Sequence, residues 1–176
     1  MKKERKKSTK ILIWVFSVII LAFAVITVIW ASYYIRIWSP LMKSFASYPD
    51  YSVNKTLKSE MVMFDNKDYC MAAKPSFLQF YGNLQASSQL DPKTNKLKTY
   101  SCTVLIWPQK DKTFIYGVHI YKNDGNNATM VCESYYDPSD YSVKSKLDTD
   151  ELNAFNTEKA DIMRLTKEAD KVFGIK

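Results

Sequence analysis

The most reactive side chains in this sequence belong to three cysteines and a single histidine: Cys70, Cys102, Cys132 and His119. Three thiolates and an imidazole can form a structural zinc site, but such sites usually contain a close Cys-x-x-Cys pair. Here the cysteines are about thirty residues apart. A cysteine–histidine nucleophile needs a lowered thiol pKa and a third group that orients the base. The spacing indicates neither arrangement, so we predict no metal site and no catalytic residues.

Common catalytic and cofactor-binding motifs are also missing from the sequence. It contains no Gly-x-Ser-x-Gly, no phosphate-binding loop and no His-Glu-x-x-His. We therefore expect a protein that is not an enzyme and that holds no cofactor. Asn54 and Asn127 each begin an Asn-x-Thr glycosylation pattern, which predicts that both residues lie at the surface.

The cysteines have a second use, because disulfides persist in domains outside the cytoplasm. Three is an odd number, so at least one thiol stays free or pairs with another chain. The hairpins expected around QKDK and NDGNN place Cys102 opposite about His119 and Cys132 opposite about Val118. These two cysteines would then flank one strand at about 10 Å, beyond the limit of about 7 Å between Cα atoms. Three alternatives stay open: a disulfide from Cys70 to Cys102 or Cys132, a disulfide to another chain, or three buried free thiols, which we favour.

The net charge of +7 is concentrated at the start of the chain. Residues 1–10 contain six lysines and arginines and one glutamate, a net charge of +5, whereas the rest of the chain carries +2. A nucleic-acid-binding domain would carry its own basic face. The nearly neutral body therefore predicts no nucleic-acid partner.

Residues 11–35 contain no charged side chain. About 20 apolar residues in a helix cross a hydrocarbon core of about 30 Å, so this segment can span a membrane with some tilt. A signal peptide would have an apolar region of about 7–15 residues before a small-x-small site, but ASYYIRIW follows here. Aromatic residues gather near both ends of the segment, as expected at lipid–water boundaries: Trp14, Trp30, Tyr33, Tyr34 and Trp38. We predict a retained single-pass anchor in the cell membrane.

The charges beside the anchor predict its orientation and the domain organisation. Lysine and arginine are in excess on the cytoplasmic side, so residues 1–10 are predicted to be a basic cytoplasmic tail. Residues 36–59 are predicted to be a juxtamembrane stem or linker. The alternative for this segment is a short helix from Pro40 whose apolar side chains face lipid or protein. Residues 60–176 are predicted to form an extracytoplasmic domain.

Segments rich in aromatic and β-branched residues follow Glu60 and are separated by turn formers. Six such segments stand out: EMVMF, YCMAA, SFLQFYGNLQAS, LKTYSCTVLIWP, TFIYGVHIYK and ATMVCESYY. Short turns cannot make parallel crossovers, so an antiparallel, meander-like sheet of 4–6 strands is predicted.

The last segment of the chain has a helical pattern. Asp148 or Thr149 can cap its N-terminus, and Gly174 can end it in the left-handed conformation. The apolar residues between them recur at three, four or seven positions and give one apolar stripe. We therefore predict an α+β domain in which this amphipathic helix packs on one face of the sheet.

A domain tethered outside a membrane and lacking a catalytic motif acts through its contacts. The predicted strands are rich in aromatic residues, and the sheet face opposite the helix would expose part of them. Trp107 and Pro108 are the first candidates for partner contact. One hypothesis is an accessory or scaffolding subunit of a membrane or envelope assembly, such as a secretion or conjugation complex, with a membrane or envelope protein as partner. The alternative is a tethered ligand-binding or sensing module, which an enclosed apolar cavity would favour.

Overall fold

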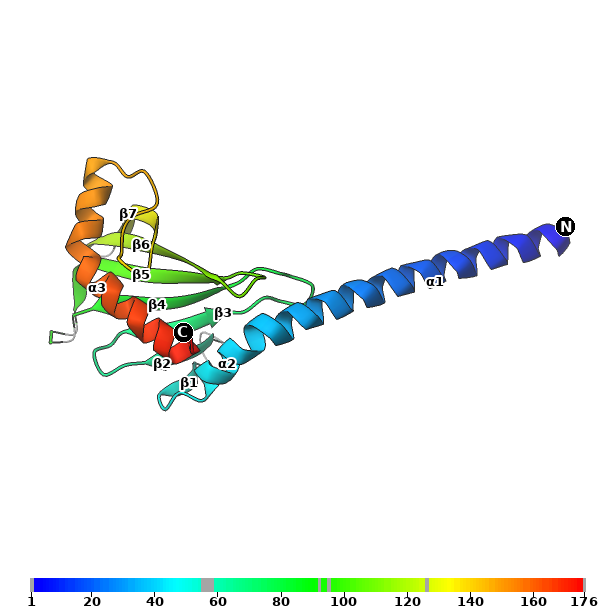
Figure 1. Cartoon of the computed structure of the whole chain (residues 1–176), viewed down its shortest axis with the longest axis horizontal. Helices are drawn as coiled ribbons and strands as arrows, with labels where there is room; N and C mark the ends of the chain where they lie inside the picture. Colours follow the sequence, from blue (N-terminus) through cyan, green and yellow to red (C-terminus); the bar gives the residue numbers. More distant parts are fainter. Residues whose placement is uncertain (1, 55–58, 92, 95, 126, 176) are drawn as a thin grey trace.

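The computed structural model describes residues 2–54, 59–91, 93–94, 96–125 and 127–175. The side chains of residues 1–9, which include most of the predicted basic tail, and those of Asn54 and Ser59 lie outside this description. The chain forms a long N-terminal helix that projects away from a sheet, with a second long helix across one face of the sheet (Figure 1). The predicted α+β arrangement is confirmed.

The N-terminal helix α1 (Lys2–Tyr33) continues without interruption into the π-helical turn η1 (Tyr34–Trp38) and the short helix α2 (Ser39–Ala46). Its most apolar stretch has a mean hydropathy of 3.0, and none of that stretch is buried. An apolar helix of this length without protein cover is typical of a membrane span. The helix is long and apolar enough to cross a membrane, although a signal sequence has the same properties.

Seven antiparallel strands form one sheet in the order of the chain. Their bounds are β1 Tyr51–Asn54, β2 Ser59–Met63, β3 Tyr69–Ala73, β4 Asn83–Leu90, β5 Leu97–Pro108, β6 Phe114–Asp124 and β7 Asn127–Tyr136. The predicted meander is confirmed, but the predicted 4–6 strands are too few. The extra strand is β1, which has only four residues and therefore shows too little alternation to be recognised. Residues 76–82, predicted as the start of a strand, belong instead to the β3–β4 loop, which consists of residues 74–82.

The C-terminal helix α3 (Thr149–Phe173) has both predicted end signals. The Asp148 side chain accepts a hydrogen bond from the Glu151 backbone N–H, and the Glu151 side chain accepts one from the Asp148 N–H. Gly174 has φ of 68°, a left-handed conformation that ends the helix at low steric cost. The apolar stripe of α3 packs across strands β4 to β7, as predicted.

The segment predicted to be a linker, residues 36–59, is structured wherever it is described. Trp38, Leu41 and Phe45 are buried in the main core. The Phe45 ring stacks on Phe173 at the end of α3, with 4.9 Å between ring centroids. Of the two alternatives for this segment, the structure shows the short helix, with its apolar side facing protein. The Ser44 hydroxyl adds a hydrogen bond from α2 to the Val172 carbonyl of α3, at 3.0 Å.

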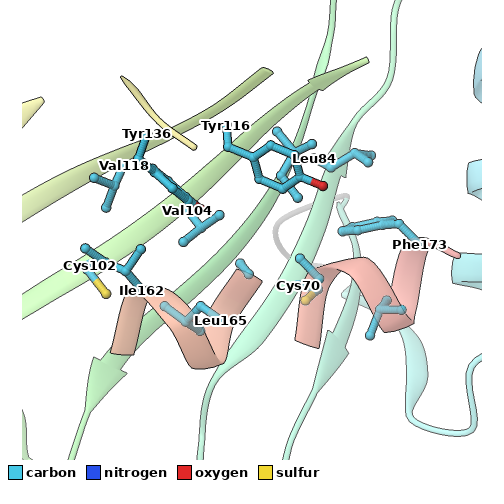
Figure 2. Close-up of a cluster of buried hydrophobic side chains, with 14 of the residues drawn as sticks. Cys70, Leu84, Cys102, Val104, Tyr116, Val118, Tyr136, Ile162, Leu165 and Phe173 are labelled. Atoms are coloured by element: carbon cyan, nitrogen blue, oxygen red, sulfur yellow. The ribbon is translucent and has the colours of Figure 1, made fainter. Parts of the chain in front are cut away.

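The main core lies between α3 and the sheet face that α3 covers. Alternate strand residues point into it, and they include all three cysteines. Figure 2 shows two of these cysteines, Cys70 and Cys102. Figure 2 also shows the α3 side chains that close it: Ile162, Leu165 and Phe173. The opposite sheet face is therefore free to present other side chains.

Candidate functional site

The structure separates the residues that had been considered for catalysis. Thr103, not Cys102, pairs with His119, and Cys102 pairs with Ile120. This register differs by one residue from the predicted one. A shift of one residue turns a side chain to the other face of a sheet. His119 therefore lies on the face opposite Cys102, where its Nε2 is 3.4 Å from a Glu133 carboxylate oxygen.

The three cysteines are free, buried and far apart along the sheet. Cys70 lies on β3, two strands from Cys102 and four from Cys132, or about 10 Å and 19 Å in strand spacings. A disulfide from Cys70 to either partner is not formed, because both distances exceed what the bond can bridge. Burial raises the pKa of Cys70 and Cys102 well above the usual thiol range and that of Cys132 to about 11. Protonated, buried thiols are chemically inert.

Cys102 and Cys132 flank the same strand, as predicted, although the register again differs. Both pair with Ile120 rather than with His119 and Val118. A bulge between Ile120 and Tyr121 accounts for one residue of the two-residue difference at Cys132, because it shifts the β6–β7 pairing beyond it by one.

One group of potential metal ligands lies beside Cys102. Its sulfur and the carboxylate oxygens of Glu158 and Asp161 all lie within 4.8 Å of one another. The Lys98 ammonium is 2.5 Å from an Asp161 oxygen and already supplies a positive charge there. Burial also raises the pKa of Glu158. The arrangement is therefore explained as a lysine–carboxylate pair beside a buried thiol.

The sheet face away from α3 is the most distinctive surface of the domain. We call it the open face. Its apolar and aromatic members come from β2, β3, β5, β6 and β7: Met61, Met63, Tyr69, Met71, Leu105, Trp107, Ile115, Tyr121, Met130 and Tyr135. Ile115 on β6 is 44% exposed, and Tyr135 on the edge strand β7 is 47% exposed. Exposed apolar patches of this kind mark contact surfaces.

Trp107 lies at the end of the open face near the β5–β6 hairpin, where it pairs with Ile115. Its ring lies directly over the backbone of Gly117, because a Cβ at Gly117 would come within 2.8 Å of a ring carbon. The ring also contacts Tyr135, with centroids 5.7 Å apart. Pro108, the other predicted contact residue, is buried on the face toward α3. The two residues therefore point in opposite directions, and only Trp107 belongs to the open face.

A row of polar side chains crosses the open face beside the apolar residues. The hydroxyl oxygens of Ser87 and Thr103 are 2.8 Å apart, and His119 and Glu133 continue the same row. The register places this row between Tyr121 and Met130 on one side and Leu105, Trp107 and Tyr135 on the other, so it divides the apolar residues of the open face into two groups. The alternation of apolar and polar residues in the sequence predicted where the strands lie. Assigning His119 to the open face also required the β5–β6 register to within one residue.

The predicted membrane-flanking aromatic residues have different surroundings. Trp14 is exposed on α1, whereas Trp38 is fully buried and Tyr33 nearly so. The Trp38 indole N–H donates to the Tyr33 hydroxyl at 3.1 Å, and Tyr33 donates to the Phe80 carbonyl at 3.0 Å. Trp38 is thus a core residue rather than a membrane flank, because the helix runs directly into the fold.

A groove of about 660 Å³, open on one side, lies between Tyr33, the β3–β4 loop and the β5–β6 hairpin. Trp107 and Ile115 line this groove at the edge of the open face. It is a recess in a surface and does not form an enclosed apolar cavity.

Comparison with known proteins gives no match: no family, no curated protein and no solved structure is similar to this chain. Functional inference therefore rests on the open face, the long apolar helix and the surroundings of the titratable residues.

Proposed function

We propose that this protein is a non-catalytic, membrane-anchored accessory or scaffolding subunit of a membrane or envelope assembly. The open face is its contact surface for a membrane or envelope protein. The observation that carries the proposal is the exposure of clustered apolar side chains on that face, including Ile115 and Tyr135. A soluble domain with no partner gains nothing from such a surface, which in water favours aggregation.

In this proposal α1 is a retained anchor with its N-terminus in the cytoplasm and the sheet domain outside. Two observations support retention: Tyr33 and Trp38 belong to the protein fold, and no break separates α1 from α2. The net charge of +5 in residues 1–10 supports the orientation. The test is a membrane-impermeant thiol reagent applied to intact cells carrying Thr94→Cys, which lies on an exposed turn. Labelling only after lysis would contradict the orientation.

The absence of catalysis is supported by the placement of the reactive groups. Cys102 and His119 lie on opposite sheet faces, and burial raises the pKa of all three thiols. A cysteine nucleophile needs the opposite change in pKa and a base on its own face.

The test of the assembly role is cross-linking in intact cells, purification in mild detergent and mass spectrometry of the proteins recovered. We expect a stoichiometric membrane or envelope protein, and we expect Ile115→Glu combined with Tyr135→Glu to abolish its recovery. Leu152→Glu is the matched control, because Leu152 is 43% exposed but lies on α3. A partner that survives the double substitution would assign the contact to another surface.

The second candidate function is a tethered ligand-binding or sensing module. The observation in its favour is the groove of about 660 Å³ beside Trp107, which is lined by aromatic and charged side chains. Its test is thermal denaturation of the full chain with a small-molecule library. A ligand that raises the midpoint in the parent protein but not in Trp107→Ala would favour this function over the assembly role.

A further inference from the structure

The β3–β4 loop (residues 74–82) lies against the side of α1. The Phe77 ring contacts Phe23 and Trp30 of α1, with centroids 6.3 Å and 5.1 Å apart. The Trp30 indole N–H is directed at the carbonyls of Ser76 and Gln79, at 3.2 Å and 3.0 Å. Figure 1 shows this loop reaching from the sheet to α1. The loop is thus held at the level of α1 residues 23 to 30.

That level lies within the membrane if α1 spans it. The uncharged residues 11–35 extend over roughly 38 Å of helix, more than the hydrocarbon core of about 30 Å. A spanning window of about 20 residues can therefore slide within this segment. Every such window includes residues 16–30. Phe77, which contacts Phe23 and Trp30, lies at the depth of the span in all of them.

The exposed side chains of the loop suit a lipid environment. Phe77 is 54% exposed and Tyr81 is 72% exposed, although both are large and aromatic. Tyrosine is enriched at the boundary between headgroups and hydrocarbon, and phenylalanine is favoured in the hydrocarbon itself. In water, by contrast, the loop would expose these rings without benefit.

Several backbone carbonyls of the loop have hydrogen-bond partners within the protein. Backbone polar groups at membrane depth must have hydrogen-bond partners within the protein. The carbonyls of Ser76, Gln79 and Phe80 accept from Trp30 and Tyr33, and the Gln79 N–H donates to Ser76 within the loop. Trp30 and Tyr33 therefore supply partners for three loop carbonyls that lipid could not satisfy.

Basic side chains lie on the domain side of the loop. The Lys110 ammonium lies over the Phe80 ring, 5.4 Å from its centroid. Lys110 and Arg36 line a groove that begins at Val28 and Ile29 on α1. Cations immediately outside an apolar span meet lipid phosphates. Along α1 toward the domain, the Phe77 ring therefore comes first and the charges of Lys110 and Arg36 come next. A bilayer has the same order, with hydrocarbon first and lipid headgroups next.

We propose that the β3–β4 loop enters the extracytoplasmic leaflet, with Phe77 in the hydrocarbon and Lys110 and Arg36 at the phosphate level. The domain is then docked on the bilayer in one orientation and does not swing on a tether. This inference rests on the proposed function in one respect, namely that α1 spans the membrane.

The test uses the full chain in vesicles of phosphatidylcholine and phosphatidylglycerol at three to one. A nitroxide spin label is attached to one of three variants, Phe77→Cys, Ile20→Cys or Thr94→Cys. The unlabelled native cysteines are buried, and the parent protein measures their background. Collision of the label with oxygen, which dissolves in lipid, is compared with collision with a water-soluble nickel chelate.

We expect collision with oxygen to dominate at positions 20 and 77 and collision with the chelate to dominate at position 94. If the chelate dominates at position 77 while oxygen dominates at position 20, the loop is in water and the inference is wrong. A label at position 77 shielded from both would assign the loop to a protein contact and also overturn it. If the chelate dominates at position 20 as well, α1 does not span, and the proposed anchor fails with it.

Discussion

Asp170 is a carboxylate placed where α3 meets the sheet. Burial raises its pKa, and the hydrogen bond from the Tyr116 hydroxyl, 2.8 Å away, offsets part of that rise. A carboxyl whose pKa is raised by folding favours the folded state most below the pKa of the unfolded chain. That contribution is lost as the pH rises through the folded pKa. Asp170 therefore costs stability at neutral pH.

We predict that Asp170→Asn raises the free energy of unfolding at pH 7 and has little effect below the usual carboxyl pKa range. The amide oxygen still accepts from Tyr116, so the change removes the charge and keeps the hydrogen bond. Urea denaturation of the full chain in detergent at several pH values measures this difference. Tyr116→Phe is the converse variant and should destabilise by about 1–3 kcal/mol at pH 7, because it leaves the carboxylate unpaired. An equal effect of Asp170→Asn at all pH values would contradict the account.

A second residue pair joins α3 to the β2–β3 turn. Asp68 is almost fully buried and pairs with Arg164 of α3, and Asn66 donates a further hydrogen bond to it at 2.8 Å. We predict that Arg164→Met lowers the free energy of unfolding by about 3 kcal/mol, because the Asp68 carboxylate stays buried without its positive partner. Adding Asp68→Asn to that variant should restore part of the loss. A double variant less stable than Arg164→Met alone would show that the pair is not the cause.

At the scale of elements, the capping box of α3 is the clearest local stabilising device. Asp148→Ala removes the acceptor for the Glu151 N–H at 2.9 Å. We predict a loss of about 1 kcal/mol in the free energy of unfolding, the usual cost of a lost N-cap. Asp150→Ala is the matched control, since Asp150 lies in the same turn and makes no capping hydrogen bond. Equal losses in both variants would indicate a general charge effect at the helix N-terminus.

Sequence patterns predicted α3 because its signals are local: a cap, an apolar period and a final glycine lie within one segment. They predicted six of the seven strands for the same reason. β1 was missed because four residues carry almost no pattern, and only pairing with β2 makes them a strand. The face of His119 was missed because it depends on a register accurate to one residue.

The predicted linker shows a different limit of sequence reasoning. Trp38 follows an apolar span closely, so position alone suggested a membrane flank. Its indole N–H instead meets the Tyr33 hydroxyl inside the core. A hydrogen-bond partner for a buried indole is set by tertiary packing, and the local sequence pattern does not predict it. The open face was expected in kind, because an amphipathic helix can cover only one side of a sheet.

At the scale of the molecule, three features combine. α1 is the proposed membrane anchor, α3 completes a core on one sheet face, and the other face stays open. If α1 spans a membrane, the contacts of the β3–β4 loop with Trp30 and Phe23 hold the open face at one angle to that membrane. A contact surface held near a bilayer in one orientation suits a subunit that meets a neighbouring membrane protein.

The central claim is that the open face contacts a membrane or envelope protein. The most direct measurement is site-specific photo-cross-linking in intact cells, with a photoreactive amino acid replacing Tyr135 on the open face or Leu152 on α3. The account predicts one adduct of defined mass, containing a membrane or envelope protein, from position 135 and none from position 152. An adduct from position 152 alone, or no adduct from position 135, would contradict it.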